Sequence, residues 1–100
     1  MERTGKQFLW DPQKNEHLKR TRGISFEEIV PHLQGEDLLD DIEHPNAKRY
    51  PGQRLYVVRI QDYVYVVPCV ESNDSIFLKT AFPSRKATRE YLTHASKKEH

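Results

Sequence analysis

Three basic side chains occur within five residues near the C-terminal end of the sequence. Arg85, Lys86 and Arg89 follow Ser84, whose hydroxyl is a favourable N-cap for a helix that starts there. Cations in the first turns of a helix are locally unfavourable, because the helix dipole is positive at that end. The same backbone N–H groups and cations can, however, bind a phosphate. The alternative is a solvated basic helix face, which composition alone favours.

The charges are unevenly distributed along this chain of 100 residues, whose net charge is only +1. Residues 36–43 contain five acids and no base, residues 48–60 contain four bases and no acid, and residues 75–100 contain six bases and two acids. A partner responds to such local fields, whereas the near-neutral total argues against a protein that coats nucleic acid indiscriminately. The acidic stretch 36–43 either shields a basic site or solubilises a loop.

The length predicts one small domain over residues 1–100, with a frayed tail after about residue 95. A single cysteine, Cys69, excludes an internal disulfide, and its apolar surroundings favour a small buried side chain over a nucleophile. No apolar run is long enough to span a membrane and the N-terminus lacks a signal-peptide core, so we expect a soluble, cytoplasmic protein. The five histidines and Cys69 share no metal-ligand spacing and no Gly-rich phosphate loop occurs, so we expect neither a metal site nor a cofactor.

The first half of the sequence predicts a short strand and two helices. Residues 7–10 are the strand, and Asp11-Pro12 starts a helix that runs to about Arg22 and stops at Gly23. Ser25 and Glu28 form a capping box for a second helix, which closes at Gly35. Its core-facing residues recur at helical spacing: Phe26, Ile29, Val30 and Leu33. Residues 36–53 are interpreted as a mobile loop, with a short strand or an anchored turn near residues 38–42 as the alternative.

The second half predicts three strands and a C-terminal helix. Strands over residues 54–60 and 63–70 flank a tight hairpin at Gln61-Asp62, which places Arg54 beside Cys69 and Ile60 opposite Tyr63. Residues 63–70 are apolar on both faces, which predicts a central strand covered on both sides.

Two prolines modify this pattern. Pro68 predicts a bulge or a lost ladder bond, and Pro83 ends a third strand over residues 76–82. The last helix then directs Ala87, Tyr91 and Leu92 inward. The expected class is therefore α+β: two N-terminal helices and one C-terminal helix on a small antiparallel sheet, formed by a three-strand meander and the short N-terminal strand.

Three motifs give the chain a resemblance to a known family: Phe8-x-Trp10-Asp11-Pro12-x-Lys14, Arg22-Gly23-Ile24-Ser25-Phe26-Glu27-Glu28 and Ser84-Arg85-Lys86-Ala87-Thr88. In this order and spacing they resemble the BrnT family of bacterial toxins, which have the RelE-like ribonuclease fold and are encoded beside an antitoxin that silences them. The resemblance covers nearly the whole chain. Two positions depart from the family pattern, since Arg22 stands where the family commonly has His, and Leu18 where it often has Asn.

The resemblance implies that the chain is the toxin of a type II toxin–antitoxin pair. Such a toxin is a metal-independent endoribonuclease that inhibits translation. Its expected partners are an RNA substrate, either free or presented on the ribosome, and a cognate antitoxin with a ribbon-helix-helix part. Promoter DNA would be bound only through that antitoxin. The second hypothesis is a catalytically silent RNA-binding or protein-interaction domain of the same fold, for which Arg22 in place of His is the hint.

RNA cleavage beside a 2′-hydroxyl needs a base, cations at the phosphate and an acid for the leaving oxygen. Arg85 matches the family's terminal motif, and Arg54 can grip a phosphate bidentately. Tyr91, Glu71, His94 and Lys79 are alternatives for the acid and base, and each also has an ordinary structural or surface interpretation. The candidate catalytic residues are Arg85, Arg54, Tyr91 and Glu71, and the candidate RNA- or phosphate-binding residues are Lys86, Arg89, Lys79, Ser84 and Arg22.

Overall fold

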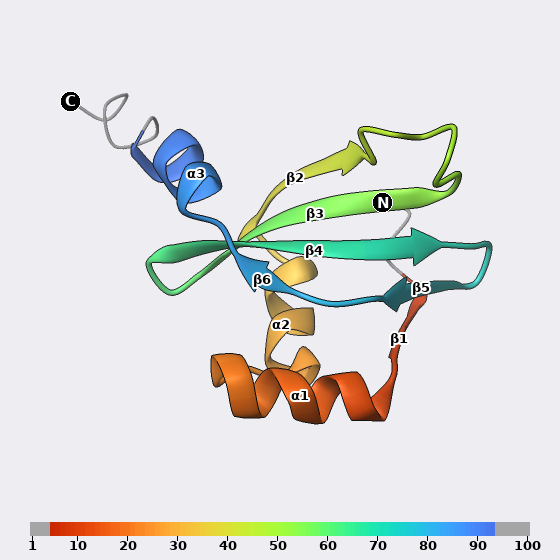
Figure 1. Cartoon of the computed structure of the whole chain (residues 1–100), viewed down its shortest axis with the longest axis horizontal. Helices are drawn as coiled ribbons and strands as arrows, with labels where there is room; N and C mark the ends of the chain where they lie inside the picture. Colours follow the sequence, from red (N-terminus) through yellow and green to blue (C-terminus); the bar gives the residue numbers. More distant parts are fainter. Residues whose placement is uncertain (1–4, 94–100) are drawn as a thin grey trace.

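Two capped helices form the N-terminal part of the fold in the computed structural model, which describes residues 5–93 (Figure 1). Helix α1 (Pro12–Arg22) begins at Asp11, whose carboxylate accepts from the Gln13 backbone N–H, and ends at Gly23 with a left-handed φ of 69°. Helix α2 (Phe26–Leu33) begins at Ser25, and both halves of the predicted capping box with Glu28 are present. Both helix predictions are confirmed, although α2 ends two residues before Gly35.

A buried amide joins the two helices. Asn15 of α1 accepts a hydrogen bond from the Phe26 backbone N–H at 2.8 Å and donates one to the Glu27 carboxylate at 2.8 Å. The second bond is the main cause that holds the pKa of Glu27 below its ordinary value. Because Asn15 satisfies an otherwise unpaired N–H at the start of α2, it fixes the angle between the helices and buries Phe26 against Trp10.

The sheet has the strand order β1-β5-β4-β3-β2, and a short sixth strand pairs with β4. The strands are β1 (Gln7–Trp10), β2 (Leu38–Glu43), β3 (Gln53–Ile60), β4 (Tyr63–Glu71), β5 (Ser75–Leu78) and β6 (Phe82–Pro83). Neighbours are antiparallel except for β1, which is parallel to β5. The α+β class is confirmed, but the prediction of a purely antiparallel sheet was wrong. Strand β1 reaches the edge of β5 from far away in the sequence, so no hairpin constrains its direction.

The β3–β4 hairpin has the predicted register. Ile60 pairs with Tyr63 and Arg54 with Cys69, and Gln61 in the two-residue turn has a φ of 60°. Strand β4 is central as expected, since β3 lies on one side of it and β5 and β6 lie on the other.

The segment after residue 35 is a strand over part of its length. Residues 38–43 form β2 at the edge of the sheet, so the interpretation of the whole stretch 36–53 as a mobile loop was wrong. Three of these six residues are acidic, and a fourth, Ile42, is exposed. This composition suits an edge strand, but it obscures the alternation of apolar and polar residues by which a strand is recognised in a sequence. Two acids of this strand, Asp40 and Asp41, accept hydrogen bonds from Tyr91 and Arg54, which a local sequence pattern does not reveal.

The predicted strand over residues 76–82 is interrupted. Strand β5 ends at Leu78, which pairs with Cys69, and β6 resumes with Phe82 opposite Val66. Regular continuation would bring Ala81 opposite Val66, so the chain accommodates one extra residue opposite Pro68 and turns Ala81 into the core. Pro68 accepts a bond from the Lys79 N–H at 2.9 Å but has no N–H to return, in agreement with the irregularity predicted there.

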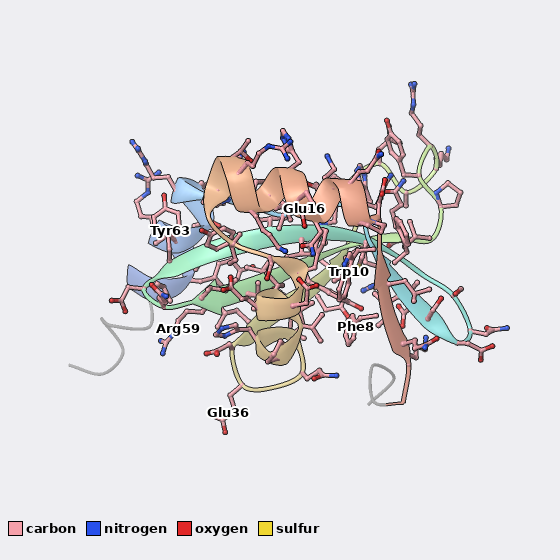
Figure 2. The ribbon with its side chains drawn as sticks, turned by 90° about the horizontal axis from the view of Figure 1, so that it is seen from below. Phe8, Trp10, Glu16, Glu36, Arg59 and Tyr63 are labelled. Atoms are coloured by element: carbon pink, nitrogen blue, oxygen red, sulfur yellow. The ribbon has the colours of Figure 1, made fainter. Side chains whose placement is uncertain are left out.

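The sheet separates two apolar clusters. The larger cluster lies between the sheet and α1 and α2, and it includes Phe26, Ile29, Tyr56 and Val67. Figure 2 shows this side, with Phe8 and Trp10 of β1 beside α1. The smaller cluster lies on the opposite face, where Val57 and Val64 pack against the C-terminal helical segment. None of the helices described for residues 5–93 is long and apolar enough to cross a membrane.

Candidate functional site

The basic segment near the C-terminus is anchored to the start of β4. Ser84 caps it as predicted, because its hydroxyl accepts from the Ala87 N–H at 3.0 Å. Thr88 extends the anchor, since its hydroxyl donates to the Ser84 carbonyl at 2.7 Å and accepts from the Val64 N–H at 2.9 Å. Only Arg85–Ala87 is α-helical, and Thr88–Thr93 continues as a π-helix, which departs from the regular helix expected.

The three cations of this segment lie exposed. We name Arg85, Lys86 and Arg89 the basic cluster. Within residues 5–93, no hydrogen bond or ion pair engages their side chains, whereas other basic side chains are paired, as in Lys6–Glu71 and Arg54–Asp41. Buried Ala87 lies between them and holds the segment on the sheet. The cluster is therefore a group of exposed cations on an anchored backbone segment, and it is available to an anion.

Tyr91 lies on the same segment and contacts an acid that the sequence analysis did not select. Its hydroxyl donates to the Asp40 carboxylate of β2 at 2.8 Å. This hydrogen bond, with burial as the second cause, raises the pKa of Tyr91 above the ordinary tyrosine value. The phenol therefore keeps its proton at neutral pH and is a donor. Asp40 and Tyr91 are 51 positions apart in the sequence, and no local signal joins them.

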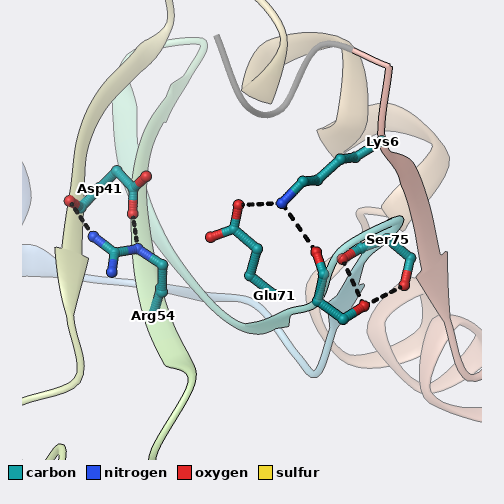
Figure 3. Close-up of polar contacts among 6 residues, drawn as sticks. Lys6, Asp41, Arg54, Glu71 and Ser75 are labelled. Carbon is teal, nitrogen blue, oxygen red and sulfur yellow. Dashed lines mark hydrogen bonds and ion pairs between the residues drawn. The ribbon is translucent and has the colours of Figure 1, made fainter.

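Arg54 and Glu71 lie near each other, and Figure 3 shows each of them with its own partner. Arg54 donates to the Asp41 side chain at 2.6 Å and to the Asp41 carbonyl at 3.2 Å, and the first bond is the main cause that raises its pKa. Glu71 accepts from Lys6 at 2.8 Å. Both residues line a shallow hollow of about 300 Å³, with Gln53 and Ser72. Each charge is already matched inside the chain.

Strand β4 separates these two groups. Arg54 pairs with Cys69, whereas the basic segment is bonded to Val64, five residues earlier on the same strand. At about 3.3 Å per residue this separation is roughly 17 Å along the strand. The structure thus brings Tyr91 and Ser84 together with the basic cluster, but it does not bring Arg54 or Glu71 there.

The remaining candidates lie in three further places. Lys79 is exposed, and its ammonium is 3.5 Å from the Gln53 amide oxygen. Arg22 ends α1 and lines a hollow of about 760 Å³ beside the β3–β4 hairpin, together with His32 and Tyr63. His94 lies outside the described residues.

Cys69 is buried, as predicted, and burial raises the pKa of its thiol to about 12. The thiol is therefore protonated at neutral pH and is not a nucleophile. Its neighbour Tyr56 is equally buried, and its pKa is also raised, mainly by burial. No group of three or more His, Cys, Asp or Glu side chains within residues 5–93 is arranged to hold a metal ion.

Neither a comparison with protein-family models nor one with curated proteins finds a match for this sequence. The resemblance to the BrnT family rests on the sequence motifs, and it stays a prediction.

Proposed function

We propose that the chain is an RNA-cleaving toxin that inhibits translation and is neutralised by a cognate antitoxin. The observation that carries this proposal is the basic cluster, three exposed cations without an internal partner in the described chain, on the same segment as the protonated Tyr91. Cations that stand close together on an anchored segment, with no internal partner to give up, can bind an RNA phosphate.

The proposed roles follow from the charges and protons of these groups. Arg85, with Lys86 and Arg89, would hold the scissile phosphate and stabilise the charge that develops on it. In the reaction, the 2′-hydroxyl gives its proton to solvent and its oxygen bonds to phosphorus, while the bond from phosphorus to the 5′-oxygen breaks and that oxygen takes up a proton. Tyr91 is the candidate donor of that second proton. Because its single hydroxyl proton is donated to Asp40 in the free chain, the hydroxyl would have to turn from Asp40 to the 5′-oxygen in the reaction.

Arg54 and Glu71 receive no role at this phosphate. Their distance along β4 separates them from the basic cluster, and Asp41 and Lys6 match their charges. The acidic stretch thus supplies partners to both groups of candidates, Asp41 to Arg54 and Asp40 to Tyr91.

The test compares labelled RNA incubated with purified wild-type chain, with Arg85→Ala and with Arg20→Ala. Arg20 is an exposed arginine near the end of α1, so its replacement controls for net charge. We expect cleavage by the wild type and by Arg20→Ala, and a loss of about 100-fold or more for Arg85→Ala. If free RNA stays intact, the same comparison is made with translating ribosomes. Equal cleavage by all three proteins would remove the basic cluster from the mechanism.

A second candidate function is a silent relative that binds RNA or protein without cleaving. The observation in its favour is that Arg54, Glu71 and Tyr91 are all engaged by other side chains of the chain. RNA binding that depends on Arg85, with no cleavage in either assay, would identify this function.

A further inference from the structure

The face of the sheet opposite α1 and α2 is apolar, but only one end of it is covered. The C-terminal segment packs on Val57 and Val64 at the hairpin end. Beyond that end, eight apolar side chains of this face are half-buried or exposed, and we name them the open sheet face: Leu9, Ile42, Leu55, Val66, Pro68, Val70, Phe77 and Phe82.

The strand register shows that these residues are continuous. Leu9 pairs with Phe77, and Phe77 pairs with Val70, which forms one row across β1, β5 and β4. A second row crosses β4, β3 and β2 through Pro68, Leu55 and Ile42. Since paired residues point to the same face of a sheet, the two rows make one apolar surface over five strands.

Exposed apolar side chains in this number are unusual on a sheet face that contacts water. Leu9 is 41% exposed, and Phe77 and Ile42 are each 39% exposed. A face in contact with water normally alternates polar residues with the core-facing ones, but β4 is apolar on both faces over most of its length. The sequence pattern predicted a strand covered on both sides, and residues 5–93 supply that cover only at the hairpin end.

The residues outside the described range have few apolar side chains. Residues 1–4 and 94–100 contain only Met1 and Ala95 as apolar residues. A contiguous apolar face of this kind typically marks a site for another protein.

The charges around the open sheet face indicate the chemistry of its occupant. Lys79 reaches across it, since its ammonium lies 3.5 Å from Gln53, which shares the face with its pairing partner Val70. Arg85 follows Phe82 after two residues, so the basic cluster borders the same surface. The acids nearby are fewer, namely Glu90, which is exposed, and Asp40, which is bonded to Tyr91. A second copy of this chain would bring like charges together.

We propose that the open sheet face is the docking surface for an amphipathic, acidic helical segment of a second protein. The apolar side of that segment packs on Leu9, Phe77 and Leu55, and its Asp and Glu side chains lie along Lys79 and the basic cluster. The surface itself is argued without nuclease chemistry, and only the identification of the partner as the antitoxin rests on the proposed function. Docking there would cover the basic cluster and so exclude a phosphate from it.

The test uses a defined probe, a 20-residue helix-forming peptide with leucines at helical spacing on one side and glutamates on the other. A matched peptide carries lysines in place of the glutamates. Binding is measured by fluorescence anisotropy for the wild type, Phe77→Ser and Leu9→Ser, with Tyr50→Ser as the control. Tyr50 is similarly exposed, at 37%, but lies in the loop between β2 and β3.

We expect the acidic peptide to bind the wild type and Tyr50→Ser equally, and to bind Phe77→Ser and Leu9→Ser about 10-fold or more weakly. Lys79→Glu should weaken the acidic peptide and favour the lysine peptide. Circular dichroism checks that each variant is folded, and two variants on different strands protect against one that is not.

Three results would overturn the proposal: no binding of the acidic peptide, equal binding to wild type and both face variants, or equal binding of the two peptides to the wild type. A wild-type dimer in sedimentation that Phe77→Ser dissociates would assign the face to a second copy. Loss of binding to single-stranded RNA in Phe77→Ser, with peptide binding unchanged, would assign it to RNA. Since the peptide assay needs no RNA cleavage, it succeeds or fails independently of the nuclease proposal.

Discussion

The hydrogen bond between Tyr91 and Asp40 is the clearest place to test how the C-terminal segment is held. Tyr91→Phe removes the hydroxyl and keeps the ring, which packs with Val57 and Val64. A hydrogen bond to a charged group contributes about 1.5–3 kcal/mol when well shielded, and because both side chains are half-exposed we expect less than that, about 1–1.5 kcal/mol. For a chain of this length that corresponds to a fall in Tm of roughly 4–10 °C.

A double-mutant cycle with Asp40→Ala isolates the bond from other effects of each substitution. Urea unfolding of the wild type, the two single variants and the double variant should give a coupling free energy of about 1 kcal/mol. A coupling near zero would mean that the two side chains do not stabilise each other, and that the contact does not anchor the segment.

The pH dependence of the same pair has a definite sign. The pKa of Tyr91 is raised in the folded chain, so the folded state holds the phenolic proton more tightly than the unfolded state does. The contribution is therefore fully present below the unfolded pKa of about 10 and is lost as pH rises through the raised folded value. The stability difference between wild type and Tyr91→Phe should be constant from pH 7 to 9 and decrease above pH 10. A difference that grows above pH 10 would contradict the assignment.

Two further substitutions test the burial of Cys69 and the anchoring of the basic cluster. Burial raises the pKa of Cys69 from 9.0 to about 12, so the free energy of unfolding of the wild type should fall by about 1.4 kcal/mol more than that of Cys69→Ala between pH 8 and 10. If urea unfolding shows that both proteins lose the same free energy over this pH range, the reasoning is refuted. Ser84→Ala removes the N-cap of the basic segment and should cost about 1 kcal/mol, measured by thermal unfolding. The control is Ser75→Ala on β5, which removes only an exposed hydrogen bond to the Ser72 hydroxyl and should change stability less.

The predictions that succeeded concern residues close together in the sequence. Asp11 and Gly23 mark the two ends of α1, because the Asp11 carboxylate and the Gly23 N–H each form a hydrogen bond with a backbone group about one turn away or less. The register of the β3–β4 hairpin follows from its two-residue turn, which places Arg54 beside Cys69 without reference to the rest of the chain. Ser84 is another such case, since the N–H that its hydroxyl accepts from is only three residues away.

The predictions that failed concern partners far apart in the sequence. The stretch that contains β2 is predicted as a loop because its acidic residues are typical of a solvated turn. Only the folded chain places Arg54 beside Asp41 and Tyr91 beside Asp40. The direction of β1 and the extra residue opposite Pro68 likewise depend on which strand edge is available.

The sequence by itself determined the helix caps, the hairpin register, the burial of Cys69 and the presence of three cations after Ser84, because each follows from short-range hydrogen bonding or from apolar pattern. Only the tertiary structure decided that Arg54 and Glu71 lie away from those cations, that Asp40 orients Tyr91, and that one apolar face of the sheet is left largely uncovered. The physical reason is that strand pairing brings together residues as far apart in the sequence as Phe8 and Ile76, which are 68 positions apart. Which charges then match, as Lys6 and Glu71 do, depends on the whole sheet.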